Sequence, residues 1–141
     1  MKITSFLAAL AGVQAASALE YVFLVNSSKG GEISSGMAYY ADNHSPGNGA
    51  RPSDYTDVTH GSNIHWEGKA VKGTFGTGVS FTSNIFADAA SKRANAWAGT
   101  ATNGFRNFNC YKTSNPGEKP YVLYTVDGWS VYSIYMCRNT G

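Results

Sequence analysis

The chain of 141 residues is 43% hydrophobic and 13% aromatic, carries charges at only 14% of its positions and has a formal net charge of +2. This composition excludes an intrinsically disordered chain, and the scattered basic residues do not form the clustered patch that is typical of nucleic-acid-binding proteins. Nucleic acid is nevertheless kept open as a partner.

Residues 1–18 have the features of a secretory signal peptide. Lys2 gives a positive start, residues 6–13 form a short apolar core, and Ala16-Ser17-Ala18 fits a cleavage site. The alternative is a buried amino-terminal helix. The apolar core is too short to span a bilayer, and no other apolar run approaches the required length. We therefore expect a secreted, soluble, monomeric protein without membrane contact, folded as one domain over residues 19–141.

The amino-terminal half of this domain is rich in strand-forming residues. β-branched and aromatic side chains predict strands at residues 20–26, 36–42, 63–67 and 70–75. Residues 43–51 are rich in turn-forming residues and are predicted to be a loop. This loop extends to about residue 61, which is long enough to make it a candidate functional loop.

Residues 82–97 predict an α-helix. Apolar side chains recur there at spacings of three and four, which gives one apolar stripe: Ile85, Phe86, Ala89, Ala90, Ala94 and Trp97. Thr82 or Ser83 can cap its start, and Gly99 fits its end. The small alanines indicate close packing of this helix on a sheet.

The carboxy-terminal segment predicts a β-hairpin centred on Asp127-Gly128. A type I′ turn needs positive φ at both central residues, and this dipeptide stands between two runs rich in Val, Tyr and Ile. In that register Val126 faces Trp129, and we expect Trp129 to pack against Val126 and the helix stripe. The fold class is therefore α+β, with one helix packed on a twisted, mostly antiparallel sheet. The alternative is a β-sandwich or barrel with one crossover helix.

Two features are typical of exported proteins. Cys110 and Cys137 are the only cysteines, and in an oxidising compartment such a pair most simply forms one disulfide, which would join the strand at residues 105–112 to the outgoing arm of the hairpin. Asn26 begins an Asn-Ser-Ser glycosylation acceptor, whereas the acceptor at Asn43 is weaker because Pro46 follows it.

The best candidate for chemistry is the segment His60-Gly-Ser-Asn-Ile-His65-Trp-Glu67. On a strand, His65 and Glu67 project from the same face, and a histidine beside a carboxylate is the minimum for general acid–base catalysis. A third metal ligand is not evident, so we expect neither a metal nor another cofactor. The alternative is an ordinary strand edge with no catalytic role.

Aromatic side chains offer a second candidate site, a stacking or carbohydrate-binding platform. The candidate binding residues are Tyr39, Tyr40, His65 and Trp66. Such residues more often belong to the core of a domain, and that alternative is kept.

The export signal, the length of the expected mature chain and the single cysteine pair resemble those of small secreted fungal proteins of the candidate-effector class. The tail FNCYKTS…YVLYTVDGWSVYSIYMC is similar to the cysteine-bearing carboxy-terminal segment of many such proteins. The resemblance implies a non-enzymatic interaction protein that acts on a host protein or another host component.

A second resemblance is to the guanyl-specific microbial ribonucleases and the ribonuclease-like effectors. Their order of one helix, a strand and a hairpin is compatible with residues 82–97, 105–112 and 121–136. The chain departs from their catalytic pattern, because no histidine follows Trp97 and Glu118 is the only glutamate there. The alternative function is thus a secreted, ribonuclease-like hydrolase that recruits His60, His65 and Glu67.

Overall fold

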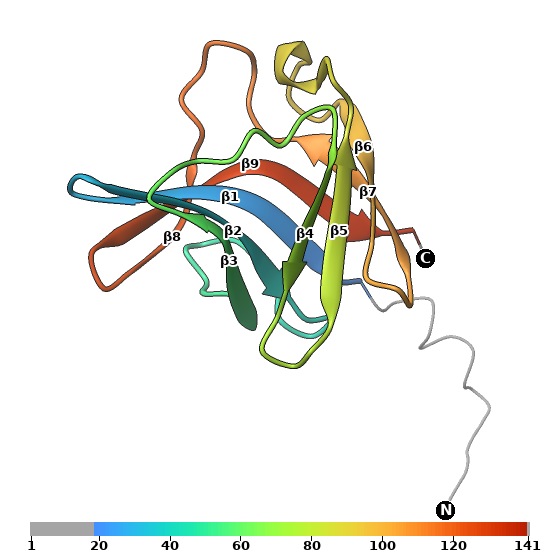
Figure 1. The fold of residues 1–141 in the computed structure, drawn as a ribbon, viewed down its shortest axis with the longest axis horizontal. Coiled ribbons are helices and arrows are strands. Elements are labelled where there is room, and N and C mark those ends of the chain that lie inside the picture. Colours follow the sequence, from blue (N-terminus) through green and yellow to red (C-terminus); the bar gives the residue numbers. More distant parts are fainter. Residues whose placement is uncertain (1–18, 141) are drawn as a thin grey trace, which may run out of the picture.

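The computed structural model describes residues 19–140, which form a nine-stranded antiparallel sheet curled into a nearly closed barrel (Figure 1). The strands are β1 (Tyr21–Lys29), β2 (Glu32–Tyr40), β3 (Asp54–His60), β4 (Ala70–Thr74), β5 (Ser80–Ile85), β6 (Trp97–Thr102), β7 (Asn107–Lys112), β8 (Val122–Val126) and β9 (Trp129–Asn139). The predicted signal peptide lies outside the described residues. No helix within residues 19–140 is long and apolar enough to cross a membrane.

The long strand β9 is the centre of the sheet. The strands follow the order β3-β2-β1-β9-β7-β6-β5-β4, and β8 pairs with the amino-terminal part of β9. β9 therefore pairs with β1 over most of its length, with β8 at its start and with β7 at its end. One central strand thus ties the carboxy-terminal hairpin to the barrel.

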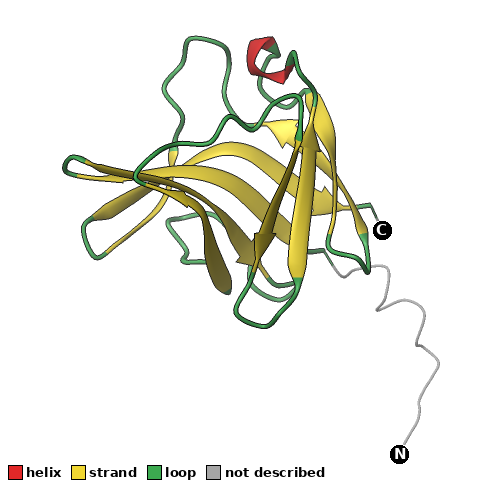
Figure 2. Ribbon diagram, viewed as in Figure 1, coloured by secondary structure: helices red, strands yellow, loops and turns green. Residues whose placement is uncertain are grey.

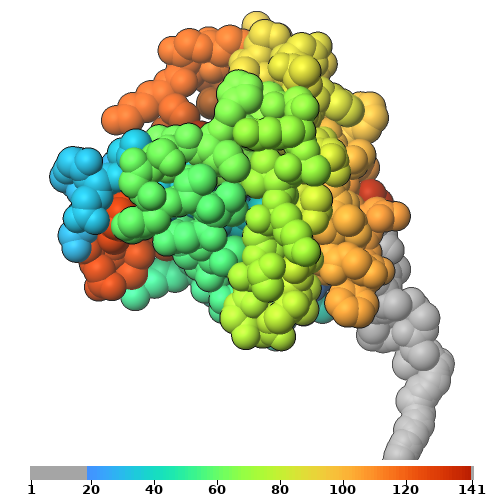
Figure 3. Space-filling view, viewed as in Figure 1, coloured from blue at the N-terminus to red at the C-terminus, as the bar shows by residue number. Residues whose placement is uncertain are grey.

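The barrel closes through side chains where β3 meets β4. The Thr56 hydroxyl on β3 donates a 2.9 Å hydrogen bond to the Thr74 carbonyl on β4. Gly73 allows this approach, because a Cβ atom there would lie 2.8 Å from the Met37 sulfur and 3.2 Å from the Thr56 methyl group. In the space-filling view the green atoms of β3 accordingly lie against the lime atoms of β4 and β5 (Figure 3).

A bulge in β9 divides the apolar side chains between two cores. The register with β1 shifts between Leu24 and Val25, so Val131 and Tyr135 face opposite sides of the sheet although they are four residues apart. The interior core holds Val22, Leu24, Met37, Trp66, Val71, Phe75, Phe81, Ile85, Ala89, Ala98, Ala101, Phe108, Cys110, Tyr135 and Cys137. The outer core holds Phe23, Val25, Ala38, Tyr40, Leu123, Tyr124 and Val131.

The predicted helix at residues 82–97 is wrong, and with it the α+β fold class. The described chain is 53% strand and 2% helical, and its one helical segment is a 3-10 turn at Ala89–Ser91 (Figure 2). β5 instead follows a period of two: Phe81, Ser83 and Ile85 are buried, and their neighbours are more exposed. Pairing with β4 and β6 overrides the helical spacing. The crossover helix of the alternative barrel is also wrong.

Gly99 was expected to end that helix, but it lies within a strand. A Cβ atom at Gly99 would lie 2.8 Å from the Ile85 Cα atom, so only glycine allows β6 to approach β5 this closely. Two further strand predictions are corrected. Residues 54–60 form β3 and not the end of a loop, and residues 63–67 make only an isolated bridge from Glu67 to Ile85.

The predicted hairpin turn is confirmed. Asp127 and Gly128 have φ of 50° and 84°, and Val126 pairs with Trp129. A register shift at Leu123 changes the expected pairing beyond Tyr124. Trp129 does not pack on a helix; it is half-buried, and its ring centroid lies 6.2 Å from that of His60.

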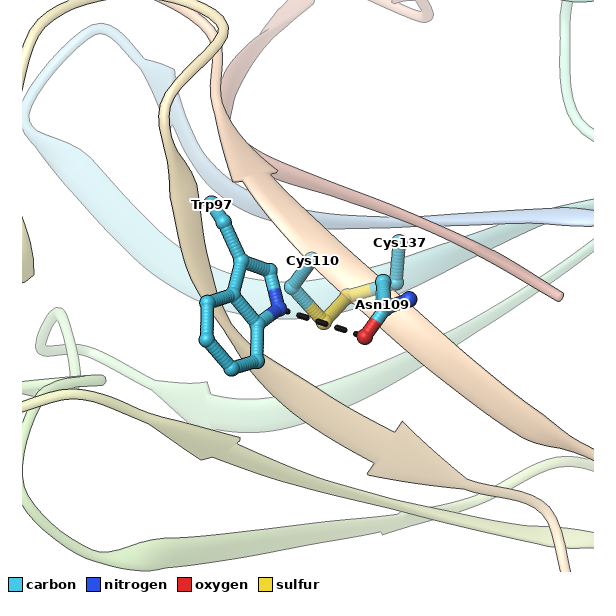
Figure 4. The surroundings of a disulfide bond; sticks show 4 residues. All are labelled: Trp97, Asn109, Cys110 and Cys137. Atoms are coloured by element: carbon cyan, nitrogen blue, oxygen red, sulfur yellow. Dashed lines mark hydrogen bonds between the residues drawn. A yellow bond between two sulfur atoms is a disulfide. The ribbon is translucent and has the colours of Figure 1, made fainter. Parts of the chain in front are cut away.

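The disulfide between Cys110 and Cys137 is also confirmed. The two residues lie directly opposite each other on β7 and β9, with Cα atoms 3.9 Å apart, and both are fully buried (Figure 4). Beside the bridge, the exposed Trp97 indole donates a 3.2 Å hydrogen bond to Asn109. The disulfide links the central strand to the β5–β6–β7 half of the barrel.

Candidate functional site

A cavity of about 500 Å³ opens at one end of the barrel. The turns that join β4 to β5 and β6 to β7 lie at this end, where the described chain also begins (Figure 1). We call it the mouth cavity; its walls come from β1, β2, β5 and β7, from the start of β3 and from the two turns. Its volume is within the range of about 300–1,000 Å³ that is usual for small-molecule sites.

Apolar side chains of the interior core form the deep part of the mouth cavity. Val22, Phe75, Phe81 and Phe108 line it, and each is at most 7% exposed. The Phe81 and Phe108 rings meet edge to face, with centroids 5.0 Å apart. Because these side chains alternate with outward-facing ones along their strands, the barrel itself supplies an apolar pocket.

A network of three polar side chains lies at the rim. The Tyr39 hydroxyl donates a 2.5 Å hydrogen bond to Glu20 Oε2, and Arg106 Nη1 lies 3.4 Å from Glu20 Oε1. The Glu20 side chain is 18% exposed, whereas Arg106 is 42% exposed. Burial, together with the hydrogen bond to Glu20, raises the pKa of Tyr39, so this hydroxyl keeps its proton at neutral pH.

The charges around the mouth cavity do not favour an anionic ligand. Glu20 and Asp54 line it with two carboxylates, and Arg106 supplies one guanidinium group. Arg106 is already paired with Glu20, so a ligand carboxylate would have to compete with that pair and face Asp54. A neutral apolar or aromatic molecule with one or two hydroxyl groups fits the walls and the rim best.

The exposed Phe105 stands at the edge of this opening. It is 83% exposed, the largest exposed fraction among the large hydrophobic side chains of residues 19–140. The turn that carries it is held by Asn103 Oδ1, which accepts hydrogen bonds from the backbone N–H groups of Phe105 and Arg106 at 2.9 and 2.7 Å. Phe105 is therefore an exposed aromatic side chain on a hydrogen-bonded turn, beside an apolar opening.

The structure does not bring the three predicted catalytic residues into one site. His60 lies at the end of β3, where its Nδ1 is 3.5 Å from Asp57 Oδ2. His65 Nδ1 is 3.4 Å from Glu67 Oε1, and neither residue lines the mouth cavity. The His65 side chain is 76% exposed, so the predicted histidine–carboxylate pair exists but faces open solvent.

The predicted binding platform is divided between core and surface. Trp66 and Tyr40 are buried at 1% and 0% exposure and belong to the two cores, so their rings offer no face to a ligand. Tyr39 lines the mouth cavity, whereas His65 is exposed elsewhere. Of the four predicted binding residues, Tyr39 alone lines the mouth cavity.

Asn26, the predicted glycosylation acceptor, lies within β1 and is half-buried. Its side-chain oxygen accepts a 2.6 Å hydrogen bond from Ser35, which is fully buried. Within residues 19–140 no group of three or more His, Cys, Asp or Glu side chains is placed to hold a metal ion.

Comparison of this chain with known families, with curated proteins and with solved structures finds no match.

Proposed function

We propose that this chain is a non-enzymatic binding protein that holds a small, neutral, largely apolar molecule in the mouth cavity. The observation that carries the proposal is a cavity of about 500 Å³ with buried aromatic walls and a Glu20–Tyr39–Arg106 network at its rim. Barrel mouths are common positions for such sites. The apolar walls would supply most of the binding free energy, and the rim would orient a hydroxyl group of the ligand.

We further propose, from the export signal and the effector-like tail, that binding serves action on a host component. The cysteine pair forms the disulfide that an oxidising compartment favours. A protein that takes up or delivers a small molecule is one concrete form of such an interaction protein.

Hydrolysis remains the alternative function, and the His65–Glu67 pair is its support. The His65 side chain is 76% exposed, and neither His65 nor Glu67 lines the mouth cavity. His65→Ala should therefore leave any turnover of RNA unchanged. Loss of a measurable ribonuclease activity in this variant would favour the hydrolase.

The mouth cavity can be tested with the neutral fluorescent probe N-phenyl-1-naphthylamine. We expect its emission to rise on titration with the folded protein, because the probe enters an apolar site. Val79→Asp places a charge in the wall of the cavity and should weaken probe binding by about tenfold or more.

Val122→Asp is the matched control. Val122 is 47% exposed on β8 and does not line the mouth cavity, so this variant should bind the probe as the unaltered chain does. Absence of probe binding, or equal loss in both variants, would contradict the proposal.

A further inference from the structure

A second cavity, of about 410 Å³, lies on the outer face of the sheet, away from the barrel interior. β3 forms one side of it and the β8–β9 hairpin the other, and Figure 1 shows these elements on the same side of the molecule. Side chains of β1, β2 and the loop before β3 complete it. We call it the hairpin cleft; none of its lining residues lines the mouth cavity.

One wall of the hairpin cleft is rich in hydroxyl groups. Ser27, Ser34 and Tyr55 line it together with the carboxylate of Asp57. The Ser34 hydroxyl donates a 3.0 Å hydrogen bond to Asp57 Oδ1. The ring of Tyr55 lies across Gly36, where a Cβ atom would be 2.6 Å from its Cζ atom.

The opposite wall is apolar and aromatic. Tyr124, Val126, Trp129 and Val131 line it from the two strands of the hairpin. Tyr124 and Val131 are buried in the outer core, whereas Trp129 is only half-buried. The cleft therefore combines a flat apolar face with a polar edge.

Two of the side chains that line this cleft, Arg51 and Trp129, carry hydrogen-bonding groups without a partner among the described residues. Within residues 19–140 the Arg51 guanidinium makes no hydrogen bond or ion pair, and the Trp129 indole N–H makes no hydrogen bond. His60 has its Nδ1 near Asp57 and its ring beside Trp129. The formal charges of Arg51 and Asp57 cancel, which suits a neutral ligand with several hydroxyl groups.

We propose that the hairpin cleft binds a neutral saccharide, with one sugar ring stacked on Trp129 and its hydroxyl groups bonded to Arg51, Asp57 and His60. A pyranose ring has an apolar C–H face and a hydroxyl-bearing edge, which matches the two walls. The rings and aliphatic side chains of the hairpin would cover the C–H face. The polar wall supplies both donors and acceptors, as a hydroxyl group needs because it both donates and accepts. This inference does not depend on a ligand in the mouth cavity.

The test uses the three tryptophans as reporters in nitrogen–proton correlation spectra. Their indole N–H signals, assigned with one Trp→Phe variant each, report on the interior core (Trp66), the outer surface of β6 (Trp97) and the cleft (Trp129). Tetrasaccharides of chitin, cellulose, laminarin and mannan are titrated to millimolar concentration. We expect at least one of them to shift the Trp129 signal and to leave those of Trp66 and Trp97 in place.

Calorimetric titration of variants then assigns the contacts. Trp129→Ala and Arg51→Ala should each weaken binding of the active tetrasaccharide by about tenfold or more. Trp97→Ala is the matched control, since it removes another exposed indole outside the cleft, and its affinity should be unchanged. Because the Arg51 side chain makes no hydrogen bond or ion pair with the residues that the structure describes, its variant stays informative if Trp129→Ala fails to fold.

Three results would overturn the proposal: no tetrasaccharide shifts the Trp129 signal, the shifts centre on Trp97, or Arg51→Ala binds as tightly as the unaltered chain. Binding of N-phenyl-1-naphthylamine tests the mouth cavity, so the proposal for that cavity and the proposal for the hairpin cleft can be contradicted separately.

Discussion

The hydroxyl of Tyr135 on β9 donates a 2.5 Å hydrogen bond to the carboxylate of Glu67, which lies 68 residues earlier in the chain. Tyr135 is fully buried, and the Glu67 side chain is only 10% exposed. The bond fastens the segment between β3 and β4 to the central strand. The carboxylate that the sequence suggested as part of a catalytic pair thus accepts a hydrogen bond from a buried residue of the central strand.

Tyr135→Phe should lower the free energy of unfolding by about 1.5–3 kcal/mol, the usual contribution of a hydrogen bond to a charged group. The substitution keeps the ring and removes only the donor, so the Glu67 carboxylate loses its main partner at low exposure. Urea unfolding measures the difference. Tyr121→Phe, at a residue that is 47% exposed, is the control and should change stability by under about 0.5 kcal/mol. If Tyr135→Phe and Tyr121→Phe lowered the free energy of unfolding equally, the result would argue against a structural role of the Tyr135–Glu67 hydrogen bond.

The buried tyrosines predict a loss of stability at alkaline pH. Burial is the main cause that raises the pKa of five of them: Tyr39, Tyr40, Tyr55, Tyr124 and Tyr135. For Tyr55 the pKa rises to about 12 from an ordinary value of 10.0. The folded state therefore holds these protons more tightly than the unfolded chain. Their stabilising effect is complete below about pH 10 and is lost as the pH rises toward about 12.

Thermal unfolding across this alkaline range measures the effect. The midpoint should stay level up to about pH 10 and then fall, with tyrosinate absorbance appearing in the same transition. Tyr124→Phe removes one of the five groups and should make the fall less steep. A midpoint that stays level up to about pH 12 would contradict the burial of these hydroxyls.

Loss of the Cys110–Cys137 disulfide should lower the free energy of unfolding by about 3–4 kcal/mol, because the bond closes a loop with a sequence separation of 27 residues. Urea unfolding of the chain with and without a reductant tests this value. The double variant Cys110→Ala/Cys137→Ala should match the reduced protein and should not respond to reductant. If the reductant also lowered the free energy of unfolding of the double variant, its effect would not come from the Cys110–Cys137 disulfide.

The sequence predicted the features that depend on a few neighbouring residues. The Asp127-Gly128 turn follows from the positive φ that both positions need, and it is present. The cysteine pairing followed from the number of cysteines and the expected compartment, and it is also present. Neither inference required knowledge of which distant strands pair.

The segments whose structure was predicted wrongly depend on pairing between strands that are distant from each other in the sequence. The apolar residues between Ile85 and Trp97 have helical spacing, yet Ile85 pairs with Gly99 across β5 and β6. The mouth cavity was missed for a related reason. Glu20 precedes β1 and Arg106 precedes β7, and they meet because both strands pair with the end of β9. No local pattern marks such a pair.

Gly36→Ala should destabilise the chain by about 1–3 kcal/mol or more, through overpacking beside the hairpin cleft. An added Cβ atom would lie 2.6 Å from both the Thr56 carbonyl oxygen and the Tyr55 Cζ atom, so the Tyr55 ring must move. Gly76→Ala is the matched control, since nothing lies within 4 Å of its added Cβ atom. Thermal unfolding compares the two. If saccharide binding is found, Gly36→Ala should weaken it, whereas Gly76→Ala should not.

When each of the three tryptophans is replaced by alanine, the loss in the free energy of unfolding should increase with the burial of the residue replaced. Trp66 is 1% exposed in the interior core, so Trp66→Ala should cost about 3–5 kcal/mol. Trp97 is 52% exposed and packs on one face against Phe86, so its loss should cost under about 1 kcal/mol. Trp129 is half-buried beside His60 and should fall between them, at about 1–2 kcal/mol. Urea unfolding of the three variants measures the series. A cost for Trp129→Ala as large as that for Trp66→Ala would mean that Trp129 is a core residue, and it would remove the accessible ring on which saccharide stacking depends.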